Sequence, residues 1–367
     1  MPTSTAFRRG DAGAAVAEIR DRLVRLDLLD AVDSEVEPAV ADVFDHRLDA
    51  AVRHFQQDQG LTVDGVVGPQ TYRRLDEARW SLGDRVLSYT VSHPIRGDDV
   101  ADLQQRLSDL GFDPGYVDGI FGPATEQAAR QFQRNMGLAA DGTCGPATFQ
   151  AVGRLNRAVV GGKPVAMREH EVIRRSGPTL AGKVVVLDPG HGGHDAGVTA
   201  HGLTESEVTE DIAARIEGRL TARGVQAFLT RGAGANELDD EGRAAFANDA
   251  GADLVVSLHI DHHDNTEARG AATYYYGGDR HGAHSAIGER LATLLQTELV
   301  NRTDLVDCRT HAKTWDLLRA TKMPAVRLEL GYLTNAGDAA RLADPAFRDA
   351  VAEAVLAAVT ELYAVSE

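Results

Sequence analysis

The second half of the chain places two histidines and a carboxylate where they could hold a catalytic metal ion. His191 follows an Asp-Pro-Gly turn, Glu205 opens a stretch with helical spacing, and His259 ends an apolar run. Two histidines and one carboxylate suit catalytic zinc, which takes three nitrogen or oxygen ligands and keeps a fourth position for water. Bound zinc lowers the pKa of that water to ~7 and polarises a carbonyl group, so an amide can be attacked at neutral pH.

A second carboxylate, Glu329, could supply the proton transfer that amide hydrolysis needs. It lies near the end of another predicted strand, Ala325–Leu330. One group has to take the proton of the attacking water and pass it to the leaving amine, and a nearby carboxylate can do both. Spacing alone does not establish such a site, since a histidine after a glycine turn is more often structural. On the residues alone, both interpretations stay open.

The elements that would position these residues alternate between strand and helix from Lys183 onward. Strands are predicted at 184–187, 225–229, 253–258, 271–276 and 325–330, and helices at 205–222, 239–250, 285–300 and 345–363. This alternation predicts an α/β domain with a mixed sheet flanked by helices. His191, His259 and Glu329 would leave strand ends, where open α/β sheets place their ligands.

The first 155 residues contain an internal repeat. The shared residues of the first copy are Phe55-Gln56, Gly60-Leu61, Asp64-Gly65, Gly68-Pro69 and Thr71, and those of the second are Phe132-Gln133, Gly137-Leu138, Asp141-Gly142, Gly145-Pro146 and Thr148. Apolar residues upstream recur at three- and four-residue spacing, which predicts amphipathic helices. We therefore expect two small three-helix modules at 1–80 and 90–158, a linker or strap at 159–182, and the α/β domain at 183–365.

Composition narrows the possible partners. The net charge of −17 argues against a nucleic-acid or anionic-membrane surface, because phosphate binding needs clustered lysine and arginine. Cys144 and Cys308 are too few for a cysteine metal site or a disulfide framework. No stretch approaches the ~20 apolar residues of a membrane span. The first residues hold no apolar signal region, so a cytoplasmic location is expected.

The repeats resemble the peptidoglycan-binding type 1 domain, a small three-helix module found beside cell-wall hydrolases. Both copies hold the full tract F-Q-x-x-x-G-L-x-x-D-G-x-x-G-P-x-T. Nearly all of its apolar residues are expected in the cores of the modules. The resemblance implies contact with peptidoglycan through exposed loop residues that the sequence does not identify.

The C-terminal half resembles the catalytic domain of zinc-dependent N-acetylmuramoyl-L-alanine amidases of the amidase-3 type. The resemblance is carried by the tracts Asp188–Gly197, Ser257–His259 and Pro324–Asn335, together with Glu205. It implies that His191, Glu205 and His259 bind Zn²⁺ and that Glu329 is the catalytic acid and base. A dinucleotide site at the glycine turn is excluded, because no G-x-G-x-x-G is present there.

The chain departs from the family pattern beside the third ligand. Asp261 stands where the family usually has asparagine, which adds negative charge near the metal and removes a hydrogen-bond donor. Asp261 and Asn335 are the candidate substrate-binding residues. The remaining nearby histidines are expected to be loop or solvated residues: His194, His201, His262 and His263. His201 is the alternative ligand if Glu205 is not one.

Two functions of different classes follow. The first is a zinc amidase that hydrolyses the amide between N-acetylmuramic acid and L-Ala of peptidoglycan stem peptides, or of muramoyl-peptide fragments. The alternative is a cytoplasmic regulatory or scaffold protein of peptidoglycan precursor synthesis, with a protein partner and weak or no hydrolysis. The domain order without a signal peptide resembles the actinobacterial CwlM-type proteins, which favours the alternative. We predict the amidase, and release to the wall by a non-signal route would reconcile activity with the expected location.

Overall fold

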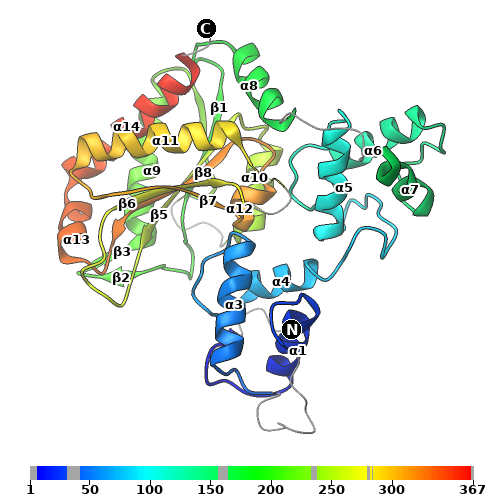
Figure 1. Cartoon of the computed structure of the whole chain (residues 1–367). Helices are drawn as coiled ribbons and strands as arrows, with labels where there is room; N and C mark the ends of the chain where they lie inside the picture. The colour runs from blue at the N-terminus through cyan, green and yellow to red at the C-terminus, as the bar shows by residue number, and fades with distance from the viewer. Residues whose placement is uncertain are drawn as a thin grey trace. The chain divides into compact units, whose positions relative to one another are not determined.

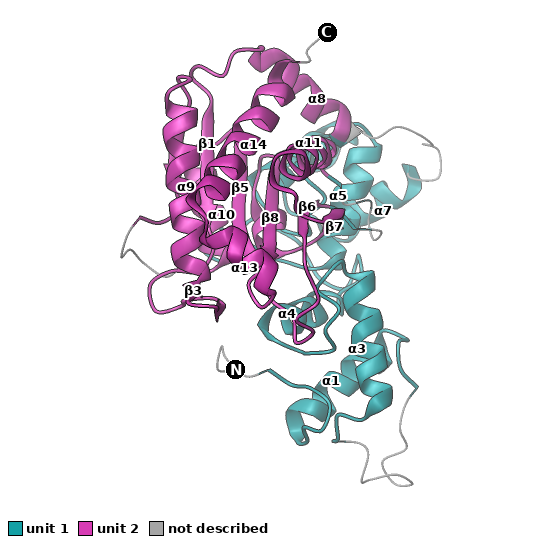
Figure 2. Cartoon of the chain, turned by 90° about the vertical axis from the view of Figure 1, so that its left-hand side faces the viewer, with its two compact units in different colours: residues 1–165, 277–284 teal, residues 166–276, 285–367 magenta. Residues whose placement is uncertain are grey.

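The computed structural model describes residues 6–30, 42–155, 164–232, 238–278, 282 and 284–364 (Figure 1). The chain divides into two compact units (Figure 2). One unit comprises residues 1–165 and 277–284, and the other comprises residues 166–276 and 285–367. The first unit contains both repeats, and the second contains the α/β domain.

Each repeat is a three-helix module with its own apolar core. The helices of the first are α1 (Ala14–Arg25), α3 (His46–Asp58) and α4 (Pro69–Glu77), and those of the second are α5 (Asp98–Asp109), α6 (Pro123–Asn135) and α7 (Pro146–Leu155). Phe55 and Phe132 are fully buried, one in each core. Several helices begin at a Gly-Pro pair, and proline suits the first turn because its missing N–H would have no helical partner. The prediction of two three-helix modules is confirmed.

The second unit is built on a six-stranded mixed sheet of order β4-β1-β5-β8-β6-β7. Its strands are β1 (Val184–Pro189), β4 (Gln226–Leu229), β5 (Leu254–Asp261), β6 (Ala271–Tyr276), β7 (Asp307–Lys313) and β8 (Ala325–Tyr332). The pairs β4–β1, β1–β5, β5–β8 and β6–β7 are parallel, whereas β6 pairs antiparallel with β8. The predicted mixed sheet is therefore confirmed.

The helices of this unit cover the sheet and complete its core (Figure 1). They are α8 (Pro164–Ser176), α9 (Glu205–Thr221), α10 (Asp240–Asp249), α11 (Ala286–Thr303), α12 (Asp316–Ala320), α13 (Ala336–Ala343) and α14 (Pro345–Ala364), and a short hairpin of β2 (Thr199–Ala200) and β3 (Leu203–Thr204) precedes α9. The apolar side chains of α9, α11 and α14 pack together with one face of the sheet in a single core.

The two faces of the sheet differ in chemistry, because successive strand residues point to opposite sides. On β5, Leu254, Val256, Leu258 and Ile260 lie in the apolar core. Ser257 and His259 alternate with them and point to the other face, where they are buried. Arg327 and Glu329 of β8 pair with these two residues across the ladder. The second face is therefore polar, and it carries the candidate site.

Several elements differ from the sequence prediction, and the short helices α12 and α13 are among those that were not predicted. The polar edge strand β7 was not predicted, because its residues alternate between exposed and half-buried and carry no apolar signal. The hairpin of β2 and β3 was also not predicted. The segment 159–182, expected as a linker or strap, contains α8. Ile173 of α8 is buried in the core of the second unit. The helix is thus packed on the α/β domain.

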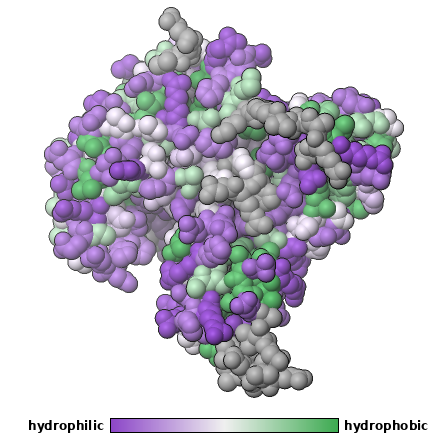
Figure 3. All heavy atoms as spheres, in the orientation of Figure 1, coloured by the Kyte–Doolittle hydropathy of each residue, from purple (hydrophilic) through white to green (hydrophobic). Residues whose placement is uncertain are grey.

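The surface is mixed in polarity. On the face drawn in Figure 3, hydrophobic residues lie in small groups among hydrophilic ones. Across the described part of the chain, no helix combines the length and the apolar character that crossing a bilayer would require.

Candidate metal centre

His191 lies on a tight loop after β1 that two buried arginines hold in place. Arg243 donates a hydrogen bond from Nη2 to the carbonyl oxygen of His191 at 2.7 Å, and Arg231 donates from Nη2 to that of Gly190 at 3.0 Å. The φ of His191 is +60°, in the left-handed region that non-glycine residues seldom adopt. A side chain on Gly190 would overlap the ring of His259. Glycine at this position lets the two histidines approach each other.

Glu205 is the first residue of α9 and is only 1% exposed. Its Oε1 accepts a hydrogen bond from the backbone N–H of Ile260 at 3.0 Å, and its Oε2 accepts one from Val198 N–H at 3.1 Å. A carboxylate in the first turn of a helix also interacts favourably with the helix dipole. The carboxylate is therefore fixed between β5 and the loop before β2.

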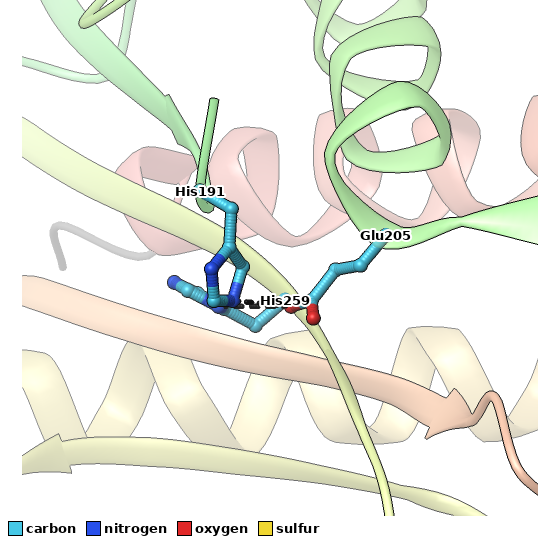
Figure 4. Close-up of side chains that lie close together, drawn as sticks. All are labelled: His191, Glu205 and His259. Carbon is cyan, nitrogen blue, oxygen red and sulfur yellow. Dashed lines mark hydrogen bonds and ion pairs between the residues drawn. The ribbon is translucent and has the colours of Figure 1, made fainter. Parts of the chain in front are cut away.

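His259 projects from β5 on the polar face and completes a group of three (Figure 4). Its Nδ1 lies 3.1 Å from Glu205 Oε1, and the Nε2 of His191 lies 3.2 Å from the same oxygen. The two imidazole rings meet edge to face, with centroids 5.2 Å apart. The structure thus brings together the three residues that the sequence predicted as metal ligands.

The spacing of these donors fits a zinc ion. Each of the three residues offers a ligand atom, and these atoms all lie within 4.8 Å of one another. A tetrahedral ion with bonds of ~2.0–2.1 Å separates its ligand atoms by ~3.3 Å. The two contacts to Glu205 Oε1 are close to that separation. Among the described residues, this is the one group of three or more His, Cys, Asp or Glu side chains with such spacing.

The protonation equilibria of the three residues differ. Burial lowers the pKa of His259 to about 4, and the nearby charge of Arg327 adds to this effect. Burial raises the pKa of Glu205, but hydrogen bonds from His191 and His259 outweigh it, so the net shift is downward. Burial lowers the pKa of His191, yet its interactions with Glu205 and Asp195 raise it overall. A metal ion would therefore meet an ionised carboxylate and a neutral His259, and would displace a proton from His191.

Residues that are not candidate ligands themselves hold the loop that carries His191. His191 Nδ1 lies 2.7 Å from Asp195 Oδ2, which leaves Nε2 for a metal ion. Asp188 is completely buried and accepts hydrogen bonds from Arg243 Nη1 at 2.6 Å and Ser257 Oγ at 2.7 Å. Partners of this kind fix the orientation and basicity of metal-bound imidazole.

Glu329 lies next to this centre on the polar face, as the ladder partner of His259. It is 5% exposed. Its Oε1 accepts hydrogen bonds from Arg327, and its Oε2 is buried without a hydrogen-bond partner among the described residues. Burial raises the pKa of Glu329 to about 7, although the charge of Arg327 opposes the shift and those of Asp261 and Glu205 support it. A carboxyl with a pKa near neutrality can both accept and donate a proton at physiological pH.

The other candidates take different places. Asp261 ends β5, and its Oδ1 accepts a hydrogen bond from the N–H of His262 at 2.7 Å. Asn335 caps α13: its Oδ1 accepts from the N–H groups of Gly337 and Asp338. The remaining histidines that the sequence singled out are exposed and lie outside the group of three: His194, His201, His262 and His263. The alternative ligand His201 is therefore not part of the cluster.

Sequence reasoning missed the arginines that hold the site together. Arg243 and Asp188 are 55 residues apart, and Arg231 bonds a loop 41 residues before it. Isolated arginines carry no spacing signal, so only the folded chain reveals these contacts. Arg327 lies in the same tract as Glu329, but no role for it can be inferred from the sequence.

Two models of known families match the chain. Residues 185–361 match the Amidase_3 model, described as N-acetylmuramoyl-L-alanine amidase. Residues 12–75 and 96–152 match a model of a peptidoglycan-binding domain. The matched segments contain the shared tracts of both repeats and every residue of the candidate centre.

Two curated relatives and one solved structure show what the chain is similar to. The chain is 47% identical over 365 residues to the protein named N-acetylmuramoyl-L-alanine amidase CwlM of Mycobacterium tuberculosis, covering 98% of this chain and 89% of that one. It is 32% identical over 176 residues to the amidase LytC of Bacillus subtilis, covering 48% of this chain and 34% of LytC. The solved amidase AmiC2 of Nostoc punctiforme has 32% identity and a TM-score of 0.45, over 49% of this chain and 97% of AmiC2.

Proposed function

This chain belongs to the family of N-acetylmuramoyl-L-alanine amidases, and we propose that it is a zinc-dependent hydrolase of the amide between N-acetylmuramic acid and L-Ala. One observation carries the proposal: His191, Glu205 and His259 converge with the spacing of zinc ligands beside the buried carboxyl of Glu329. The relatives favour the amidase over the regulatory alternative.

The residues of the centre have separate tasks. His191, Glu205 and His259 would hold the ion, which when bound lowers the pKa of water and polarises the amide carbonyl. Asp195 orients the His191 ring through Nδ1. As the water oxygen bonds to the carbonyl carbon, Glu329 accepts the water proton. It then returns that proton to the amide nitrogen as the C–N bond breaks, which yields the muramoyl carboxylic acid and the free amine of L-Ala.

The repeats would hold the enzyme on its polymeric substrate. Their match to a peptidoglycan-binding model supports this role. We assign 1–80 and 90–158 to the two binding modules and 183–365 to the catalytic domain. Asp261, at the end of β5 beside the centre, would contact the substrate. Asn335 is the weaker candidate, because its side-chain oxygen already caps α13.

A paired measurement on the full chain tests the proposal. Zinc per chain is quantified first, and release of a new L-Ala amine from a muramoyl peptide is then followed with and without a chelator. We expect about one zinc per chain and release that stops when the chelator is added. A chain that binds zinc but releases no amine from either muramoyl peptide or peptidoglycan would contradict the enzymatic proposal.

A further inference from the structure

The two oxygens of the Glu329 carboxylate have very different surroundings. Oε1 accepts hydrogen bonds from Arg327, with Nε at 2.8 Å and Nη2 at 2.7 Å. Oε2 is buried and has no hydrogen-bond partner among the described residues. A buried polar atom without a partner is costly, and a catalytic role is one explanation for such an atom in a native fold. The asymmetry separates a held oxygen from an available one.

Arg327 is itself held in position by aromatic side chains. Arg327 and Glu329 are two residues apart on β8 and therefore lie on the same face of the sheet. The guanidinium carbon of Arg327 lies 4.8 Å from the centroid of the Trp315 ring, a cation–π contact. The Trp315 ring in turn lies 4.5 Å from that of Tyr274, the ladder partner of Arg327 on β6. These contacts restrict the rotation of a side chain that is 25% exposed.

We propose that Arg327 is a positioning residue for amide hydrolysis: it fixes the Glu329 carboxylate through Oε1 so that Oε2 accepts and returns the proton, and Trp315 fixes Arg327. This inference rests on the proposed function. A planar guanidinium that places two N–H donors on one oxygen fixes the position of that oxygen from two directions, which a single point charge does not. Proton transfer depends on this geometry, because the accepting oxygen must lie within hydrogen-bond reach of the proton.

Positioning of Glu329 by Arg327 accounts for the charged pair on this face of the sheet. A carboxyl buried without Arg327 would be free to turn either oxygen toward its neighbours, and ordering it would then fall to the substrate. With the arginine in place, that ordering is already present before substrate binds. Positioning of this kind acts on the chemical step rather than on substrate affinity.

Steady-state kinetics on a muramoyl peptide test the role of Arg327. The variants are Arg327→Met, which removes the donors, and Arg327→Lys, which keeps the charge. Arg219→Met is the matched control, because Arg219 is also 25% exposed and pairs with acidic residues, but on the surface of α9 and α14. We expect Arg327→Met to lower kcat by about 100-fold with KM and zinc content unchanged, since general acid–base catalysis contributes about 10²–10⁴-fold. Arg327→Lys should recover part of the loss, and Arg219→Met should match the wild type.

Trp315 provides an independent arm of the same test. Trp315→Leu removes the ring and should lower kcat about tenfold, whereas Trp315→Phe keeps an aromatic face and should stay within about twofold. A kcat for Arg327→Met equal to that of the control overturns the proposal. A rise in KM that accounts for the whole loss, or a loss of zinc in step with activity, overturns it as well, because Arg327 would then bind substrate or maintain the fold.

A spectroscopic measurement separates this inference from the proposed function. In the full chain with ¹⁵N-labelled arginine, the Arg327 Nε–H resonance is identified by its loss in Arg327→Met. We expect it to exchange with water at least about tenfold more slowly in the wild type than in Glu329→Gln or Trp315→Leu. Slow exchange without any amine release would contradict the proposed amidase activity but support the contact in which Arg327 holds Glu329. Fast exchange in the wild type would overturn the proposed positioning of Glu329 by Arg327, whether or not the chain hydrolyses the substrate.

Discussion

The repeats and the catalytic domain carry equally sharp sequence motifs, but they use the polar residues of those motifs in opposite ways. In the repeats, every motif glutamine is occupied by the fold. In the α/β domain, Oε2 of Glu329 has no hydrogen-bond partner among the described residues, and Nε2 of His191 faces another candidate metal ligand, Glu205. The difference shows that a clear motif does not by itself distinguish a structural from a functional role. The roles are distinguished by whether the polar side chains of the motif keep hydrogen-bonding or ligand atoms that the fold does not use.

The glutamine of the second repeat shows complete use. Gln133 is 1% exposed and accepts a hydrogen bond from Gly142 N–H at 2.9 Å. Its Nε2 donates to Asp141, to the Thr143 carbonyl and to the Thr148 hydroxyl. The Asp-Gly turn of the motif is thus fastened to α6 by one buried amide. Such a side chain has nothing left to offer a ligand.

The same arrangement occurs at two further places in the first unit. Gln56 makes the equivalent bonds to Asp64, Gly65, Val66 and Thr71. Gln104 of α5 bonds Asp118, Gly119, Ile120 and Thr125 in the same way. The copy at Gln104 was not recognised in the sequence, because its glutamine lies further from the Asp-Gly turn. We call the contacts of Gln56, Gln104 and Gln133 the glutamine clamps. Any contact of the repeats with the cell wall has to come from residues outside these clamps.

The largest effect should come from removing the available proton acceptor. Glu329→Gln keeps the shape of the side chain but cannot take up a proton, so kcat should fall by about 10³-fold or more. Zinc content and the thermal midpoint should stay near those of the wild type, because the substitution removes a buried charge rather than a packing group. Amine release and bound zinc are measured on the same preparation. Wild-type turnover in this variant would remove Glu329 from the mechanism.

A second substitution tests whether the comparison holds inside the catalytic domain, where some polar residues are also structural. Arg243→Met leaves the buried Asp188 without its ion-pair partner and frees the His191 carbonyl. Breaking a buried pair costs about 3–5 kcal/mol of the free energy of unfolding. Loss of a second-layer contact should also weaken zinc binding about 10–100-fold. Denaturant unfolding and zinc titration measure the two effects.

Arg215→Met is the control for Arg243→Met, because Arg215 pairs with Asp211 and Asp349 at exposed or half-buried positions. Its effect on the free energy of unfolding should be below about 1 kcal/mol. Equal losses in the two variants would contradict the distinction between buried and surface pairs. An unchanged zinc affinity in Arg243→Met would show that the His191 loop is held without it.

The sequence allows the apolar framework to be predicted, because strands such as β1 and helices such as α14 carry periodic apolar residues. It does not predict β7, whose side chains are largely polar, or the packing of α8 on the domain. The candidate ligands were predicted from a family motif, not from spacing. The contacts of Arg243 and Arg327 could not be predicted, since each depends on which strands become neighbours.

In the repeats, the expected effect is on stability alone. Gln133→Leu leaves the Gly142 N–H and the Thr148 hydroxyl without their buried partner. Unsatisfied buried groups cost about 1–3 kcal/mol, so the second repeat should lose about that much stability. Hydrogen exchange of α6 amides in the full chain measures this loss. Hydrolysis of a small soluble muramoyl peptide should be unchanged.

Gln105→Leu on α5 is the matched control for the glutamine clamp. Gln105 is half-buried and donates to Asp109, four residues along its own helix. Its loss should change the free energy of unfolding of the second repeat, measured by hydrogen exchange, by less than about 0.5 kcal/mol. A fall in soluble-substrate turnover in Gln133→Leu would contradict a purely structural role, because the glutamine would then also serve function.

The smallest expected effect separates the two regions by their response to pH. The glutamine clamps are centred on amides, which do not titrate, whereas the candidate metal centre is built from groups that do. The pKa of His191 is raised by Glu205 and Asp195 despite its burial. Below that pKa a proton occupies the site that zinc needs, so zinc affinity should rise with pH, up to about tenfold per unit while His191 is protonated.

Competitive zinc titrations at pH 6, 7 and 8 measure this dependence, with hydrogen exchange of α6, corrected for intrinsic exchange rates, as the internal reference. The sign follows from the direction of the shift: a raised pKa extends the protonated range of His191 upward from ~6.5. Asp195→Asn removes one of the two charges that raise the pKa, so the rise in affinity should begin at lower pH in this variant. A zinc affinity independent of pH would mean that His191 is not a ligand. The candidate metal centre would then not differ from the glutamine clamps in its response to pH through His191.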